Sequence, residues 1–259
     1  MQSGRGSFDK AGNKAWSWAT FFHVVTHLAV WTPFLTTVAE SARGNWRVIG
    51  DGAAIAMRSW HVMTQLRLVG QPTELGTGLH DLGPLQYWML AVPVHIDPVR
   101  GVLWGAAIWC MAAASLAIEA AWSVLGRAGG LLASGTILGM IAWSPGLAAK
   151  PYWNPCFGMM YFLAALAAAC AVMAGRRWWW PALVLTASVA MQAHLMFAIA
   201  SVLLVLLALI TGLADAFREK KRYWWAVTGC IAGLACWAAP LYQQFTSHCT
   251  SSSPATPVT

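Results

Sequence analysis

Long apolar segments recur along the whole chain, and they restrict its fold more than any other feature does. They lie at 15–38, 102–125, 131–143, 157–174, 179–191, 195–213 and 223–240. A helix needs about 20 apolar residues to cross a bilayer, and only helices and closed barrels satisfy their own backbone there. The run from 178 to 213 is too long for one crossing, and Gln192 with His194 supplies a break. The pattern therefore predicts about seven membrane spans.

The composition supports this fold class and excludes others. Hydrophobic residues make up 58% of the 259 residues, charged residues make up 10%, and the mean hydropathy is +0.56. These values lie outside the range of ordinary soluble domains. The formal net charge of +7 does not indicate nucleic-acid binding, because the basic residues lie between apolar segments and form no stripe with aromatic residues. We predict an all-α, polytopic membrane bundle that contacts membrane lipids.

The basic residues also predict the orientation of the chain. One side of the predicted membrane carries Arg5, Lys10, Lys14, Arg127, Arg176, Arg177, Arg218, Lys220, Lys221 and Arg222. Loops rich in Lys and Arg are typically cytoplasmic, so this side and the N-terminus are predicted to face the cytoplasm. The membrane is predicted to be the plasma membrane. The other side carries Arg43, Arg47, Arg58, Arg67, Arg100 and Lys150. An anionic ligand would explain why cations gather there.

The chain is predicted to have three regions. A cytoplasmic leader at 1–14 precedes a membrane domain at 15–240, which contains a long external loop at 40–99. A polar tail follows at 241–259. Its composition differs from that of the residues before it, so we interpret the tail as out of frame or disordered. We interpret the chain as truncated.

The external loop at 40–99 gathers ionisable residues that are scarce elsewhere. It contains Asp51, Arg58, His61, Arg67, Glu74, His80 and Asp81. From Asp51 onward, apolar residues recur every three or four positions and polar residues fall between them. This spacing predicts an interfacial helix with a lipid-facing side and a polar side. A second short interfacial helix is predicted between Pro84 and Pro93. Ionisable groups concentrated in one loop of a membrane protein indicate the functional site.

Two further polar clusters fall on the same predicted side. The segment 144–154 contains Lys150 and a Pro-bounded run of Tyr152, Trp153 and Asn154. This run is interpreted either as a platform for a sugar or lipid headgroup or as simple interfacial anchoring. The turn at Gln192 and His194 is the second cluster.

One histidine pair lies inside the first apolar run. His23 and His27 are one helical turn apart, which is compatible with a metal or proton site. The sequence places no carboxylate beside them, so a packed or interfacial pair is predicted, and Glu119 is interpreted as a partner of Arg127. No metal and no cofactor are predicted.

Several short motifs together resemble a known family. They are Gly50-Asp51 after the first span, His80 followed by Gly83-Pro84-Leu85 and Tyr87-Trp88-Met89-Leu90-Ala91, and Gln192-Ala193-His194. In this order they resemble polytopic glycosyltransferases of the GT-C type. These include the protein mannosyltransferase and aminoarabinose transferase groups, and the likeness is strongest to their actinobacterial relatives.

The resemblance implies a catalytic Asp in the first external loop and a sugar donor carried on a polyprenyl phosphate. Asp51 takes the position of the general base, and the acceptor would be a glycan, a lipid or a protein. The expected contacts to the donor are Arg58, His61, His80, Lys150, Asn154, Gln192 and His194. A structural alternative is that Asp51 only caps the interfacial helix.

The chain departs from the family in two ways. Members usually have more spans, and the His80-Asp81-Leu82-Gly83-Pro84 segment differs from their shorter His-Pro-Gly-Pro form. Two other functions therefore stay open. The chain is compatible with a transporter or lipid flippase, or with an inactive truncated scaffold subunit.

Overall fold

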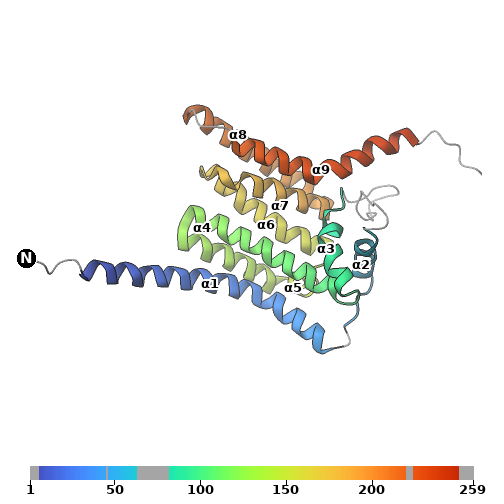
Figure 1. Ribbon diagram of the computed structural model, residues 1–259, viewed down its shortest axis with the longest axis horizontal. Helices are drawn as coiled ribbons and strands as arrows, with labels where there is room; N and C mark the ends of the chain where they lie inside the picture. The colour runs from blue at the N-terminus through green and yellow to red at the C-terminus, as the bar shows by residue number, and fades with distance from the viewer. Residues whose placement is uncertain (1–5, 45, 63–81, 220–223, 251–259) are drawn as a thin grey trace, which may run out of the picture.

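The computed structural model describes residues 6–44, 46–62, 82–219 and 224–250 (Figure 1). The described α-helices are α1 (Gly6–Arg43), α2 (Asp51–His61), α3 (Leu85–Ile96), α4 (Gly101–Trp143), α5 (Gly146–Ala149), α6 (Asn154–Met173), α7 (Trp180–Ala193), α8 (Ala198–Glu219) and α9 (Trp224–Thr250). Two short 3₁₀ helices, η1 (Arg177–Trp179) and η2 (Leu195–Phe197), precede α7 and α8. These residues contain no strand, so the predicted all-α membrane bundle is confirmed.

Five described helices are long and apolar enough to cross a membrane, fewer than the seven predicted. They are Thr20–Arg43 within α1, Gly101–Trp143, Asn154–Met173, Leu195–Phe217 and Trp224–Tyr242. One predicted span, 179–191, corresponds to α7, which has only 14 residues and is too short to cross alone. Two others, 102–125 and 131–143, both belong to α4.

The long helix α4 is a hairpin of two arms, 101–125 and 127–143. Gly126 joins them with φ 60° and ψ −139°, a backbone conformation that residues with a Cβ rarely adopt. After this turn Gly130 lies against the ring of Trp122, which brings the arms side by side (Figure 1). A side chain at 130 would meet that ring, so glycine permits the close approach. The predicted break between the second and third spans is thus real.

The centre of the bundle consists of α4, α6 and α7, whose contact faces are rich in alanine. Buried small residues such as Ala113, Ala164 and Ala168 let the helix backbones approach, and Phe157 and Met160 fill the space between them. Helices α1, α8 and α9 lie outside this centre (Figure 1). Only 17% of the apolar window of α1 is buried, against 61% for those of α4 and α6. The attachment of α1 therefore rests on few buried side chains.

The two short helices predicted in the first loop are present at one end of the bundle, away from the turn of α4 (Figure 1). Helix α3 continues past Pro93 to Ile96, so the predicted end before Pro93 is wrong; Pro93 lies in the third turn of α3. Helix α1 already begins at Gly6, within the predicted leader. Helix α9 runs through Pro240 to Thr250, so the first part of the predicted tail is helical.

Candidate functional site

Asp51 begins helix α2 at the end of the bundle where α2 and α3 lie. The preceding Gly50 has φ 58° and ψ −134°, which turns the extended chain into the helix. The indole Nε1 of Trp153 donates a hydrogen bond to Oδ2 of Asp51 at 3.1 Å, and both side chains are exposed. No side chain caps the start of α2, and the cap residue is Gly50 itself. The Asp51 carboxylate therefore accepts a hydrogen bond from Trp153 and does not cap α2, which was the structural alternative.

The segment 150–154 packs directly under α2. Gly52 lies so close to Tyr152 that an added Cβ would come within 2.5 Å of its Cε2 atom. The Tyr152 ring is buried and meets Trp46 edge-on, with ring centroids 6.1 Å apart. Burial raises the pKa of the Tyr152 phenol above its usual value, because the phenolate would lose its hydration. This packing fixes the position of the neighbouring Trp153 relative to Asp51.

Helix α3 is tied to the same segment by Gln86. Its side chain is buried, and Nε2 donates to the backbone oxygen of Tyr152 at 2.7 Å. A buried hydrogen bond of this kind connects α3 with the loop that carries Trp153, although the two are 66 residues apart. The sequence did not single out Gln86.

Gln192 is buried and holds three elements together. Its Nε2 donates to the backbone oxygen of Cys236 in α9 at 2.8 Å, and its Oε1 accepts from the backbone N–H of Leu85 at 3.4 Å. Both ends of the amide are thus used by the protein itself. The side chain predicted to contact the donor instead joins the end of α7 to α3 and α9.

The other predicted site residues of these turns differ in exposure. His194 ends α7, and its Nδ1 accepts from the backbone N–H of Met196 at 3.2 Å at the start of η2. Asn154 is buried as the first residue of α6. Lys150 is exposed at the end of α5, three residues before Trp153. Of these three residues, Lys150 has the side chain most open to a ligand.

Arg58 and His61 lie further along α2. Arg58 is positioned over the ring of Tyr87 in α3, with Cζ 5.7 Å from the ring centroid. A cation over an aromatic face is attracted to it, which directs the guanidinium toward α3. Nδ1 of His61 faces the Met57 carbonyl at 2.8 Å, so this nitrogen donates to its own helix. His80, the remaining predicted contact, lies outside the described residues.

An aromatic pair that was not predicted lies at the same end of the bundle, between α2 and α3. Trp60 of α2 stacks on His95 of α3, with ring centroids 4.5 Å apart and an interplanar angle of 5°. Since both residues are exposed, the pair forms a flat aromatic surface beside the site. Its members are 35 positions apart, and sequence spacing gave no signal for it.

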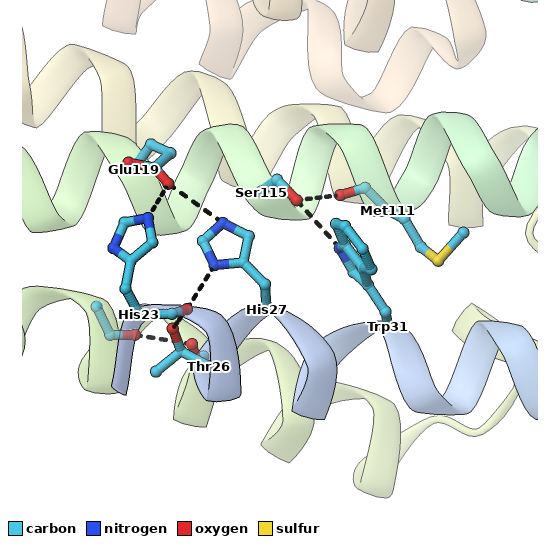
Figure 2. Close-up of polar contacts among 9 residues, drawn as sticks. His23, Thr26, His27, Trp31, Met111, Ser115 and Glu119 are labelled. Carbon is cyan, nitrogen blue, oxygen red and sulfur yellow. Dashed lines mark hydrogen bonds and ion pairs between the residues drawn. The ribbon is translucent and has the colours of Figure 1, made fainter. Parts of the chain in front are cut away.

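A second polar cluster lies between α1 and α4 (Figure 2). Ligand atoms of His23, His27 and Glu119 lie within 4.8 Å of one another. The prediction that the histidine pair has no carboxylate nearby is therefore wrong, and Glu119 contacts the histidines and not the predicted Arg127. The i, i+4 spacing of His23 and His27 was a sequence signal for a pair of metal ligands. Their contact with Glu119 could not be predicted, because the sequence does not show that α1 packs against α4.

The chain matches no protein-family model, no curated protein and no solved structure. The fold and the site are those of a polytopic helical membrane protein with an exposed carboxylate that accepts an indole N–H at one end of its bundle.

Proposed function

We propose that the chain is a membrane glycosyltransferase that moves a sugar from a polyprenyl-phosphate donor to an acceptor outside the plasma membrane, with its N-terminus in the cytoplasm. The observation that carries the proposal is the pair of Asp51 and Trp153. One carboxylate oxygen accepts the indole N–H, and among the described residues nothing is bonded to the other. An oriented, exposed carboxylate with a free oxygen suits a general base.

In the proposed reaction the acceptor hydroxyl oxygen attacks the anomeric carbon of the donor sugar. The hydroxyl proton goes to Oδ1 of Asp51 while the bond between the anomeric carbon and the phosphate oxygen breaks. The polyprenyl phosphate leaves with the electron pair, and the configuration at the anomeric carbon inverts. The reaction therefore needs one base and positive charge near the leaving phosphate.

Two cations support this assignment. Lys150 is exposed in the turn that also carries Trp153, and Arg58 lies on α2 seven residues after Asp51, which is about two helical turns. Cations aimed at a leaving phosphate stabilise the charge that develops in the transition state. Gln86 and Gln192 hold the surrounding helices in place through their buried hydrogen bonds.

The test compares sugar transfer with solute transport in the same preparation. Purified protein is reconstituted into proteoliposomes with radiolabelled polyprenyl-phosphate sugars and a mixture of glycan, lipid and peptide acceptors. The proposal predicts label in an acceptor and free polyprenyl phosphate in equal amounts. Solute or lipid movement without transfer would contradict it in favour of a transporter or flippase. Neither activity would indicate a scaffold subunit.

A further inference from the structure

The cluster of His23, His27 and Glu119 joins α1 to α4 and consists of residue types that commonly bind metal ions. The distance from Nε2 of His23 to Oε1 of Glu119 is 2.7 Å, and Nε2 of His27 lies 3.3 Å from the same oxygen (Figure 2). One turn further along both helices, Nε1 of Trp31 donates to Oγ of Ser115 at 3.1 Å. The three polar contacts form a short ladder between α1 and the first arm of α4.

The backbone fixes the protonation of one histidine. Nδ1 of His27 lies 2.9 Å from the carbonyl oxygen of His23, and a carbonyl oxygen only accepts hydrogen bonds. Nδ1 therefore carries the proton, and in the neutral ring Nε2 presents a lone pair to Oε1 of Glu119. Two electron pairs that face each other repel, so either a proton or a metal cation must lie between these two atoms. A histidine that donates Nδ1–H to a carbonyl and offers Nε2 is a common arrangement around protein-bound metals.

We propose that His23, His27 and Glu119 bind a divalent transition-metal ion, with Zn²⁺ as the chemically matched probe, and that the ion fastens α1 to α4. Two imidazole nitrogens and one carboxylate oxygen suit Zn²⁺ and exclude Ca²⁺ and Mg²⁺, which take oxygen ligands. Three protein ligands leave a fourth position for water. The site does not depend on the proposed transferase activity.

The three ligand atoms lie within 4.8 Å of one another, so all three distances can be compared with those around a tetrahedral ion. Ligand atoms about 2.1 Å from a tetrahedral zinc ion lie about 3.4 Å from one another. The separation of 3.3 Å between His27 and Glu119 already fits, and the 2.7 Å contact of His23 must open by a few tenths of an ångström. The side chains of His23 and Glu119 are 34% and 40% exposed, so both have room to move.

The sparse packing of α1 gives such an ion a structural role. Because little of α1 is buried, a metal bridge would add a strong link where packing is sparse. A cavity of about 170 Å³ lies between α1 and α4, and its wall includes Trp122, whose ring meets His23 edge-on at 4.6 Å. Glu119 is seven residues before Gly126, so the cluster lies about 10 Å along the helix from the α4 turn. This turn is at the end of the bundle away from α2 (Figure 1).

The experiment measures metal binding by the full chain, purified without a histidine tag and stripped with a chelator. Zn²⁺ is titrated against a chromophoric chelator, and Co²⁺ is added separately to record its visible spectrum. The proposal predicts one tight Zn²⁺ per chain and the absorption of four-coordinate Co²⁺, which Zn²⁺ displaces. His27→Gln and Glu119→Gln should each weaken Zn²⁺ binding about 100-fold or more, because each removes a ligand.

The controls change the same residue types elsewhere. His95→Gln and Glu40→Gln remove an exposed histidine and an exposed carboxylate, and both should bind Zn²⁺ like the parent. Zn²⁺ should also raise the melting temperature of the parent and not that of Glu119→Gln. Equal loss of affinity in the control and cluster variants would overturn the proposal. Should the cluster variants fail to fold, a parent chain without the Co²⁺ spectrum would overturn it alone.

Discussion

Trp153 donates its indole N–H to Oδ2 of Asp51 at 3.1 Å, and the two residues are 102 positions apart in the chain. The bond joins the start of α2 to the turn before α6, and the packing of Gly52 on Tyr152 holds the same two segments together. The site thus depends on contacts between the first loop and the turn after α5. Each of these contacts can be removed separately.

Trp153→Phe keeps an aromatic side chain, although a smaller one, and removes the hydrogen-bond donor. We expect turnover to fall by about 3- to 10-fold, a modest loss because the pair is exposed to solvent. The matched control is Trp143→Phe, since Trp143 is 92% exposed at the end of α4. Initial rates of sugar transfer measure both. A parent-like rate for Trp153→Phe would show that the indole does not orient the base.

Gly52→Ala tests the packing of α2 on the segment 150–154. The added methyl group would come within 2.5 Å of Tyr152, so the ring must shift, and we expect a loss of about 1–3 kcal/mol in unfolding free energy. Gly135→Ala is the control, because no atom lies within 4 Å of its new Cβ. Alanine there should be neutral or stabilising by about 0.5–1 kcal/mol. Thermal unfolding in detergent distinguishes the two, and equal melting temperatures would contradict the account.

The buried phenol of Tyr152 predicts a pH dependence. Its pKa in the folded chain is raised above 10.0 by burial, so the folded chain holds this proton more tightly than the unfolded chain. The unfolding free energy therefore falls as the pH rises above 10. Tyr152→Phe should lose less stability than the parent over that range, while Tyr242→Phe, at an exposed tyrosine, should behave like the parent. Parallel pH profiles for Tyr152→Phe and the parent would refute this prediction.

Orientation can be tested at the two ends of the bundle. Ala149 lies in α5, just before the segment 150–154 that packs on α2, whereas Arg127 lies at the turn of α4. In a cysteine-free background, a membrane-impermeant maleimide added to intact cells should label Ala149→Cys and leave Arg127→Cys unlabelled. The reverse pattern would place the Asp51 end of the bundle in the cytoplasm.

Much of the fold follows from local sequence patterns. Apolar runs of about 20 residues predict helices, and the amphipathic spacing after Asp51 predicts α2. The span count was less accurate. The break in α4 was predicted correctly, although both arms belong to one of the five long apolar helices, and the predicted span 179–191 forms only the 14-residue α7. Pro93 lies in the third turn of α3 and did not end the helix. Tertiary packing can outweigh the loss of one backbone donor there.

The candidate site was only partly predictable, for a different reason. Sequence patterns identified Asp51 and the segment 150–154 separately, but not the hydrogen bond between them. The same holds for Glu119, which lies 92 positions from His27 and was assigned to Arg127 on sequence proximity. Contacts between distant segments depend on helix pairing, and single-sequence periodicity carries no information about which helices pair.

The most direct test of the account is the turnover of Asp51→Asn. Asparagine keeps the shape of the side chain and an oxygen that accepts from Trp153, but it does not take up a proton as a carboxylate does. The variant is compared with Glu40→Gln, which removes an exposed carboxylate from α1. We predict that Asp51→Asn folds like the parent and transfers sugar about 10²- to 10⁴-fold more slowly, while Glu40→Gln retains the parental rate. Transfer at the parental rate by Asp51→Asn would contradict the assignment of Asp51 as the general base.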